Sequence, residues 1–443
     1  MQKHKLAEWY EFRNFGVVNT QTTSEIIIVG AGAAGLMAAK QLALHHAVTI
    51  LEARAEPGGR IRTIYRPGKK HIEPGAEFVH GKLPITLDLI RQAGLTYSPA
   101  QGNFYQVKDG NWELSEGMIE GWDELMEKMQ QEKDDMTMLA FLQKHYSDEK
   151  HFLLRKHITR FAEGFDLADI SRVSLKSLLE EWMNETDDNF RIDTGYMPLI
   201  RFLEKECIRL GCKIVYNSPV RLIEWRESAV KAYKDPDTFY EAEKILITIP
   251  LGLLQSREAV DAIRFVPTID PYLDAAQEMG YGSVIKFVLD FNQPFWQNKQ
   301  PDAGFIISEE QVPTWWVQQP GDTLLTGWLG GSPADELINA GNDQLLSLAL
   351  HSLSGIFQLS YAEIQGMLLE SHVFNWAHDE WADGGYSYTT PASAAALKLF
   401  NTPPGNTIFF GGEAFYEGKS PGTVEAALSN GMAVAEKIRK SIK

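Results

Sequence analysis

The stretch EIIIVGAGAAG, from Glu25 to Gly35, decides the fold of this chain. Its residues Ile26 to Val29 form a continuous β-branched run, which is typical of a strand buried on both faces. A glycine-rich turn follows, and the segment Leu36 to Leu44 has the composition of a helix. The apolar segment Ala47 to Leu51 predicts the next strand, which ends at Glu52. The sequence therefore predicts the strand–turn–helix–strand unit of a doubly wound parallel sheet.

Each glycine of this turn has its own physical task in binding the pyrophosphate of a dinucleotide. Gly30 permits the tight turn, Gly32 lets the backbone approach the phosphates, and Gly35 lets the helix pack on the strand. The free N–H groups of the helix N-terminus face the phosphates, and Glu52 can accept hydrogen bonds from ribose hydroxyls. Because strand and helix flank the motif, we expect a dinucleotide site. A glycine-rich turn in an unrelated α/β unit is the alternative.

Composition and charge exclude several classes of protein. The chain has 443 residues, of which 44% are hydrophobic and 23% charged, so disordered, collagen-like and disulfide-scaffold classes are excluded. A net charge of -17 repels phosphate backbones and anionic lipid, so we expect no nucleic-acid and no membrane partner. The same charge permits a cationic substrate. Cys207 and Cys212 are too few for a structural zinc site, and we predict no metal.

The compartment follows from the absence of targeting signals. The first twenty residues contain no apolar signal-peptide core. The charge-free run Gln344 to Ala362 is spaced like an amphipathic helix, and its serines and histidine are residues that a membrane span would avoid. We therefore expect a cytoplasmic protein, either a monomer or a homodimer.

Several further segments follow the glycine-rich turn in a fixed order. They are Val48–Arg54, Gly58–Thr63, Pro74–Gly81, Gly195–Met197, Ile247–Gly252, Gly282–Lys286, Gly384–Tyr388, Phe409–Ala414 and Gly422–Ala427. In order and spacing they resemble the motifs of the flavin-containing amine oxidase family, which includes monoamine oxidases, polyamine oxidases and lysine-specific histone demethylases. The resemblance runs from about residue 25 to residue 440, which is nearly the whole chain.

This resemblance implies a Rossmann-type FAD-binding domain interleaved with a substrate domain of antiparallel sheet and helices. From Leu83 the pattern is helical and charged, and strands return at Lys213. We assign residues 25–82, 205–280 and 385–443 to the FAD-binding domain, 83–204 and 281–384 to the substrate domain, and 1–24 to an N-terminal extension.

The family pattern also implies how FAD is bound. Glu52 would hold the ribose, Arg60 the pyrophosphate and the backbone of Val220 the adenine, while the helix that opens at Thr423 would stabilise the reduced ring. We expect non-covalent FAD, because Gly385 stands where monoamine oxidases carry the flavin-linking cysteine. The cofactor-binding residues implied are Gly30, Gly32, Ala34, Gly35, Glu52, Ala53, Arg54, Gly59, Arg60, Ala76, Glu77, Phe78, Val79, Val220, Gly412, Glu413, Thr423 and Val424.

Three residues are candidates for catalysis. Lys286 interrupts an apolar strand, and the resemblance implies that it holds a water next to flavin N5; a solvated lysine on an edge strand is the alternative. Tyr386 matches the aromatic wall that flanks the amine, with core packing as its alternative. His80 falls where several polyamine oxidases carry a histidine at the site mouth, and an ordinary surface-loop histidine is its alternative.

Two departures from the family pattern bear on the substrate. Thr423 stands where monoamine oxidases have a second aromatic wall, and Phe78 stands where amino-acid oxidases have a carboxylate-binding arginine. Four aromatic residues are expected along the approach: Trp315, Trp316, Trp328 and Phe374. Five acidic residues are candidates for holding distal ammonium groups of a polyamine, although a solvated helix face explains them as well: Glu163, Asp166, Glu185, Asp187 and Asp188.

The sequence thus predicts an FAD-dependent oxidase of a primary or secondary amine, either a polyamine or a monoamine. The amine becomes an imine that hydrolyses to an aldehyde, and O2 reoxidises the flavin to give hydrogen peroxide. An L-amino-acid or indole-type oxidase is one alternative. A flavin desaturase or isomerase, which would not need Lys286, is another. A non-catalytic FAD-binding scaffold is the alternative from a different class.

Overall fold

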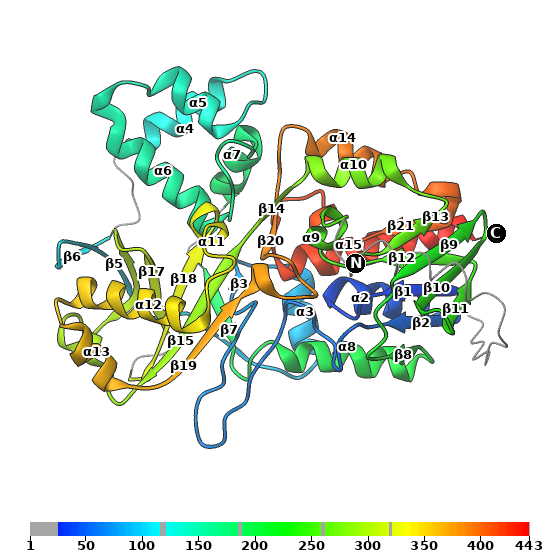
Figure 1. The fold of residues 1–443 in the computed structure, drawn as a ribbon, viewed down its shortest axis with the longest axis horizontal. Coiled ribbons are helices and arrows are strands. Elements are labelled where there is room, and N and C mark those ends of the chain that lie inside the picture. The colour runs from blue at the N-terminus through cyan, green and yellow to red at the C-terminus, as the bar shows by residue number, and fades with distance from the viewer. Residues whose placement is uncertain (1–24, 116–120, 185–187, 258–261, 319–320, 443) are drawn as a thin grey trace, which may run out of the picture.

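A computed structural model describes residues 25–115, 121–184, 188–257, 262–318 and 321–442 (Figure 1). The predicted N-terminal extension, residues 1–24, lies outside the described residues, as do Glu185 and Asp187.

A five-stranded parallel sheet lies at the centre of one half of the molecule, on the right in Figure 1. Its strand order is β21-β12-β1-β2-β8, and β1 pairs with β2 and β12 in parallel. The strands are β1 (Ile26–Val29), β2 (Val48–Leu51), β8 (Lys213–Val215), β12 (Lys244–Ile247) and β21 (Ile408–Phe410). They come from three separated segments of the chain, so the predicted Rossmann-type sheet is confirmed, while the exact domain boundaries stay a prediction.

Both faces of the parallel sheet are covered, which explains why the residues of β1 are all apolar. Ile26 and Ile28 pack against helices, and Ile27 and Val29 pack against a second, four-stranded sheet. The helices are α2 (Ala33–Leu42), α8 (Met197–Arg209) and α15 (Val424–Ser441). The second sheet has the order β11 (Thr238–Ala242), β10 (Ala229–Asp235), β9 (Leu222–Arg226) and β13 (Arg264–Val266).

A seven-stranded, mainly antiparallel sheet forms the other half, on the left in Figure 1. Its order is β19 (Leu368–Asn375), β15 (Val284–Phe291), β18 (Leu324–Gly330), β17 (Thr314–Val317), β16 (Ala303–Ser308), β5 (Asn103–Lys108) and β6 (Asn111–Leu114). The side chains on one of its faces form an apolar core with α12 (Asn342–Phe357) and its neighbour α13 (Tyr361–Met367). Four helices build a cluster with its own core: α4 (Trp122–Gln131), α5 (Met138–His145), α6 (Phe152–Phe165) and α7 (Leu175–Asn184).

The expectation that strands return only at Lys213 is wrong. The strands β4 (Tyr97–Pro99), β5, β6 and β7 (Asn189–Ile192) precede it. Most of their residues are exposed or half-buried, and β5 is held by parallel pairing with the distant strand β16. Their short polar sequences therefore carry a weak periodic signal.

The charge-free run from Gln344 to Ala362 is not one helix either. The helix α12 ends at Phe357, because Gln358 adopts a left-handed backbone, and Ser360 caps α13 together with Glu363. Among the described residues, no single helix has the length and composition of a membrane span. The helices α12 and α13 have the length and composition of a span only when they are taken together, and the chain bends by 110° between them.

Candidate active site

A continuous cavity of about 1600 Å³ joins the two halves of the molecule. It begins at the carboxyl ends of β1 and β2, where Val29 and Glu52 line it, and it reaches aromatic side chains of the seven-stranded sheet such as Trp316. In parallel α/β sheets this edge is the usual place for a nucleotide. Because pockets for one drug-sized ligand occupy roughly 300–1,000 Å³, this cavity has room for a cofactor and a second molecule.

The glycine-rich turn has the shape that a pyrophosphate requires. Gly30 has a φ of +105°, and a Cβ on Gly35 would lie 2.0 Å from the Gly30 carbonyl oxygen, so both positions demand glycine. Gly32 differs, because a Cβ there would meet only the Gly58 carbonyl at 3.9 Å. Gly32 therefore faces open cavity at the N-terminus of α2, whose first turn has no side-chain cap.

Glu52 lies at the end of the cavity that the sequence assigns to a ribose. Its carboxylate accepts hydrogen bonds from the backbone N–H groups of Ala31 at 2.7 Å and Arg54 at 2.8 Å. Burial raises the pKa of Glu52. Val220 lines the same end of the cavity.

Arg60 ties three segments together beside the turn. Its Nη1 donates to the Gly385 carbonyl at 2.6 Å and to Glu413 Oε1 at 2.9 Å. Glu413 Oε2 in turn accepts a hydrogen bond from the Ser387 hydroxyl at 2.6 Å. Arg60 and Glu413 both line the cavity, so this network presents one cation and one anion there.

Most residues that the sequence assigned to the cofactor line this cavity: Gly30, Gly32, Ala34, Glu52, Ala53, Arg54, Gly59, Arg60, Ala76, Glu77, Phe78, Val220, Gly412, Glu413, Thr423 and Val424. Gly35 does not, since it packs against Gly30. Val79 is corrected, because the alternation of side chains along β3 (Val79–His80) places it in the core, fully buried. Two lining residues that the sequence did not reveal are Trp376 and Trp381.

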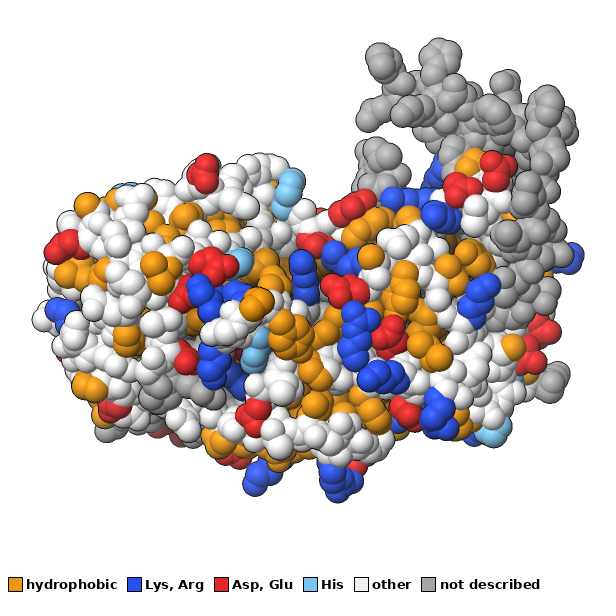
Figure 2. Space-filling view, turned by 90° about the horizontal axis from the view of Figure 1, so that it is seen from below, with side chains coloured by type: hydrophobic (Ala, Val, Ile, Leu, Met, Phe, Trp, Pro, Cys, Tyr) orange, Lys and Arg blue, Asp and Glu red, His pale blue; other side chains and the backbone are white. Residues whose placement is uncertain are grey.

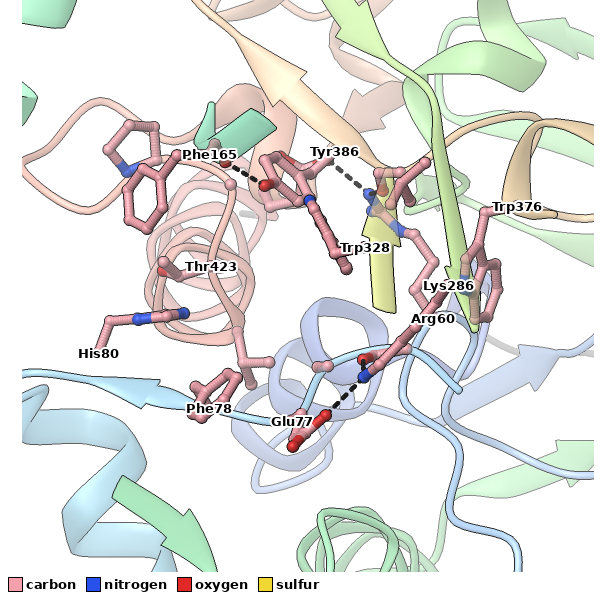
Figure 3. Close-up of a pocket in the computed structure, with 18 of the residues that line it drawn as sticks. Arg60, Glu77, Phe78, His80, Phe165, Lys286, Trp328, Trp376, Tyr386 and Thr423 are labelled. Carbon is pink, nitrogen blue, oxygen red and sulfur yellow. Dashed lines mark hydrogen bonds and ion pairs between the residues drawn. The ribbon is translucent and has the colours of Figure 1, made fainter. Parts of the chain in front are cut away.

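Lys286 is buried in the middle of the seven-stranded sheet. Its strand β15 pairs with β18 on one side and β19 on the other, and the side chain is 1% exposed, so the solvated edge-strand alternative is wrong. Its Nζ lies 2.7 Å from Glu77 Oε2 and 3.2 Å from the Gly75 carbonyl oxygen (Figure 3). Lys286 also lines the cavity.

Glu77 is the partner that sequence reasoning missed. It was predicted as a cofactor contact, whereas its carboxylate is a buried hub whose Oε1 accepts from Arg191 Nε at 2.9 Å, Trp316 Nε1 at 2.9 Å and Gln318 Nε2 at 3.0 Å. Burial alone would raise its pKa, but the charges of Lys286 and Arg191 lower the pKa of Glu77 to about 2. The sequence did contain one sign of this pairing. Glu77 and Lys286 carry opposite charges and each stands in an apolar segment, and a charge that is buried requires a partner.

Tyr386 lies at the start of β20 (Tyr386–Tyr388), where it lines the cavity and also packs against a small buried cluster that contains Leu167 and Val284. Its hydroxyl donates to the Phe165 carbonyl oxygen (Figure 3), and its ring lies against Gly422 in the loop before α15. Burial raises the pKa of the Tyr386 hydroxyl well above its usual value, so the phenol is neutral at physiological pH. Thr423 caps α15 by accepting a hydrogen bond from the Ala426 N–H at 3.1 Å.

His80 also lines the cavity, on β3. Its Nδ1 lies 2.7 Å from Asn189 Oδ1, and its ring contacts those of Phe78 and Phe165. The ring is open to the cavity, but the surrounding protein atoms reduce its hydration and lower the pKa of His80, so the imidazole is neutral at pH 7.

The aromatic end of the cavity agrees only in part with the expected approach. Trp316 and Trp328 line it, together with further rings: Phe78, Trp122, Phe161, Phe165, Trp182, Phe305 and Tyr386. The expectation for Trp315 is wrong, because strand alternation turns it to the opposite face of β17, where it is fully buried. Phe374 is corrected as well, since it is absent from the lining: it lies opposite Lys286 on the neighbouring strand β19 and packs between the cavity-lining Trp328 and the buried Val288.

The acidic residues proposed as ammonium ligands do not lie where that role requires. Glu163, Asp166 and Asp188, the three that the structure describes, are absent from the cavity lining. Glu163 packs against Gly331, and Asp166 is buried and accepts a hydrogen bond from Trp182 Nε1 at 3.1 Å. Helix periodicity alone did not show which side of the helical cluster faces the cavity.

Comparison with known proteins gives one family match over most of the chain. The family described as flavin containing amine oxidoreductase matches residues 33–439. A polyamine oxidase 4 of Oryza sativa subsp. japonica is 24% identical over 94% of this chain and 89% of its own length. Lysine-specific histone demethylase 2 of Homo sapiens is 26% identical over 93% of this chain, which spans about half (53%) of that protein.

Solved structures give the same architecture. Putrescine oxidase bound to putrescine superposes with a TM-score of 0.76 at 20% identity, covering 95% of this chain and 100% of its own. Cyclohexylamine oxidase from Brevibacterium oxydans superposes with a TM-score of 0.74 at 23% identity, covering 94% of this chain and 99% of its own. At these identities the likeness supports a shared fold.

Proposed function

The chain belongs to the family of flavin-containing amine oxidoreductases, and on that premise we propose that it is an FAD-dependent amine oxidase. The observation that carries the proposal is the single cavity that contains both the dinucleotide turn and an aromatic chamber with a buried lysine. Relatives with polyamine oxidase names support it further.

The described residues fit FAD. Gly32 and the N-terminus of α2 would hold the pyrophosphate, Glu52 the ribose and Val220 the adenine, while the N-terminus of α15 at Thr423 would face the flavin ring. When bound, the flavin supplies the redox chemistry, taking hydride equivalents from the amine and passing electrons to O2.

Non-covalent attachment is part of the proposal. Gly385 offers no side chain to the ring. Both cysteines are buried beside α2 instead, with Cys207 Sγ donating to the Leu36 carbonyl at 3.2 Å.

The chain's own residues would orient the amine and exclude water. Phe78 and Tyr386 border opposite sides of the chamber in Figure 3, and aromatic faces attract a cationic amine. Lys286, held by Glu77 and the Gly75 carbonyl, has its remaining donor capacity for a water molecule. His80 would itself add no charge to the chamber.

We propose an amine with one cationic centre and an apolar body as the substrate. Two carboxylates of the chamber already have cationic partners, since Glu77 pairs with Lys286 and Glu309 pairs with Lys156 at 2.8 Å. A polyamine is the second candidate, because polyamine oxidases are among the relatives.

An amino-acid substrate is less well supported. Arg191 stacks on Phe78 at 4.3 Å, yet each of its three nitrogen atoms already donates, to Glu77 and to the carbonyl groups of Gln318 and Val317, and Arg191 is absent from the described lining of the cavity. Arg191 is therefore held in the Glu77 network rather than in the cavity wall, where a substrate carboxylate would meet it, although L-amino-acid oxidases occur among the relatives. A monomeric or homodimeric state and a cytoplasmic location stay predictions.

The test is anaerobic bleaching of the flavin in the purified protein. The flavin is first identified after denaturation, which also shows whether it is released and thus non-covalent. Cyclohexylamine, an aryl-alkyl amine, putrescine, spermidine and L-phenylalanine are then compared, and peroxide is measured in air. We expect the apolar monoamines to bleach the flavin fastest. Failure of every amine to reduce it would contradict the proposed activity and favour a scaffold.

Lys286→Met separates amine oxidation from desaturase or isomerase chemistry. A lysine that holds a water molecule can move protons through it, and loss of such an acid–base group costs about 10²–10⁴-fold in rate. We expect a loss of that order in amine turnover, measured as peroxide formation. A variant that oxidises its substrate at the wild-type rate would favour the desaturase alternative.

A further inference from the structure

The carboxylate of Glu77 divides its two oxygen atoms between two cations. Oε2 contacts Lys286 Nζ at 2.7 Å, and Oε1 contacts Arg191 Nε at 2.9 Å. The side chains are nearly removed from solvent, with exposed fractions of 3% for Glu77, 1% for Lys286 and 13% for Arg191. Trp316 and Gln318 also donate hydrogen bonds to Oε1, the oxygen atom that Arg191 contacts.

This arrangement leaves an unbalanced charge. Two buried cations share one anion, and a further buried carboxyl group that interacts with Lys286 and Glu77 does not cancel the difference. Burial raises the pKa of that group, Glu73, to about 8, so it is mostly protonated at pH 7. Because screening by water is weak in a buried site, the surplus positive charge acts over several ångströms.

The position of the surplus depends on Arg191. Its guanidinium contacts Glu77 Oε1 and donates to the carbonyl oxygens of Gln318 at 3.1 Å and Val317 at 3.2 Å. The negative charge of Glu77 is therefore shared between Arg191 and Lys286. Lys286 lines the cavity, whereas Arg191 lies behind Glu77 and is absent from its described lining. The net positive field therefore reaches the cavity through Lys286.

We propose that Glu77 is a positioning residue that fixes Lys286 in the cavity wall, and that Arg191 tunes the site by keeping Lys286 from being fully neutralised. The proposal rests on the proposed function in one respect, which is that the cavity holds a flavin. A flavin gains negative charge on reduction, so a nearby cation favours its reduced form.

The first test measures the midpoint potential of the bound flavin by dye-coupled reduction, without any amine. Glu77→Gln removes the anion, and we expect a higher potential than in the wild type. Arg191→Met removes the second cation, and we expect a lower potential. Arg191→Lys keeps the charge and should return the potential toward the wild-type value. Gln318→Met removes a neutral donor to Glu77 and should change the potential least.

Opposite signs are the discriminating result. A purely structural role for the network would move the potential in the same direction in Glu77→Gln and Arg191→Met, or leave it unchanged, and either result would overturn the tuning part of the proposal. Because Arg191→Lys and Arg191→Met differ only at the one position, the comparison also works if Glu77→Gln does not fold.

The second test uses the flavin-free protein and examines positioning alone. Trace acetylation with acetic anhydride, followed by peptide mass spectrometry, reports how accessible each lysine amine is. We expect several-fold more label on Lys286 in Glu77→Gln than in the wild type. Lys244 is the internal reference, because it is buried and donates to the Asn406 carbonyl at 2.6 Å, far from the substitution in sequence.

The two tests separate the inference from the proposed function. Unchanged labelling of Lys286 in Glu77→Gln would overturn the positioning role even if the protein binds flavin and oxidises amines. A protein that binds no flavin would refute the proposed function, while the labelling would still decide whether Glu77 fixes Lys286.

Discussion

Glu73 is a buried carboxyl group whose two oxygen atoms have unequal surroundings. Its Oε1 accepts from the Thr63 hydroxyl at 2.8 Å and the Tyr196 N–H at 3.2 Å, whereas Oε2 has no hydrogen-bond partner among the described residues. Burial raises the pKa of Glu73 from 4.5 to about 8. The folded protein therefore holds this proton more tightly than the unfolded chain does.

This pKa predicts a pH dependence of stability. The stabilisation from the neutral acid is complete below pH 4.5 and is lost as the pH rises through about 8. Within that window we expect the contribution of Glu73 to fall by at most about 1.4 kcal/mol per pH unit, and Glu73→Gln should abolish this slope. Urea unfolding between pH 5 and 9 measures it.

The matched control is Glu127→Gln, on the exposed side of α4. It should keep the slope of the wild type. Equal slopes in the wild type and Glu73→Gln would contradict the buried, protonated state of Glu73.

At the scale of the element, the first helix shows how two glycines of one motif differ in purpose. A methyl group on Gly35 would lie 2.0 Å from the Gly30 carbonyl oxygen, whereas one on Gly32 has free space and an ordinary φ of -76°. We expect Gly35→Ala to destabilise the protein by roughly 3 kcal/mol or more, because α2 must move off β1.

Gly32→Ala should instead fold with nearly wild-type thermal stability and fail to retain FAD, since the methyl group fills the approach to the pyrophosphate. Thermal unfolding of the flavin-free proteins and fluorescence titration with FAD measure the two effects. If Gly32→Ala binds FAD as tightly as the wild type, the glycine-rich turn does not hold the pyrophosphate at Gly32.

The start of α3 (Pro84–Gln92) depends on a residue of another helix. Glu425 of α15 is buried and accepts hydrogen bonds from the N–H groups of Ile85 at 3.0 Å and Thr86 at 2.7 Å. Glu425→Ala leaves these donors without a partner, so we expect a loss of about 1–3 kcal/mol in unfolding free energy.

Glu436→Ala on the same helix is the control for this prediction. Glu436 pairs with Arg439 on the surface, where water and salt screen the pair, so its loss should be much smaller than that of Glu425. Equal losses in the two variants, measured by urea unfolding, would show that Glu425 does not cap α3.

The elements also show where local sequence sufficed. The continuous apolar strands of the parallel sheet were predicted because burial on both faces selects the same residue types along the whole strand. β5 lies between its hairpin neighbour β6 and the parallel strand β16, which is about two hundred residues away. Most of its residues are exposed, so Asn103–Lys108 lacks the apolar pattern of a buried strand and was missed.

At the scale of the whole molecule, the net charge of -17 affects how fast a substrate arrives. The face shown in Figure 2 carries Lys and Arg side chains interspersed with Asp and Glu, so the negative field is not built from a single patch there. A field of the whole molecule is screened by salt, since the Debye length falls from about 30 Å at 0.01 M to about 8 Å at 0.15 M ionic strength.

We therefore expect kcat/KM for a cationic amine to fall, by about tenfold or less, across that range of ionic strength, while kcat stays nearly constant. Stopped-flow reduction of the flavin at several salt concentrations measures the effect. The reaction of the reduced enzyme with uncharged O2 is the internal control. An amine reaction that is as insensitive to salt as the O2 reaction would exclude electrostatic steering.

The sequence by itself determined the dinucleotide unit, the order of the motifs and the family that they resemble. These are local properties, because each motif is a short segment whose residue types are dictated by a turn, a strand or a helix end. The mixed architecture followed from the same local patterns.

Only the tertiary structure decided the charge state of the chamber. Lys286 and Glu77 stand 209 residues apart, and Glu77 and Arg191 stand 114 residues apart, so no local pattern links them. The pairing of β15 between β18 and β19 buries Lys286, and burial in turn makes a partner such as Glu77 necessary. Likewise, neighbouring side chains of a strand point to opposite faces, so β17 places Trp316 in the cavity wall and Trp315 in the core.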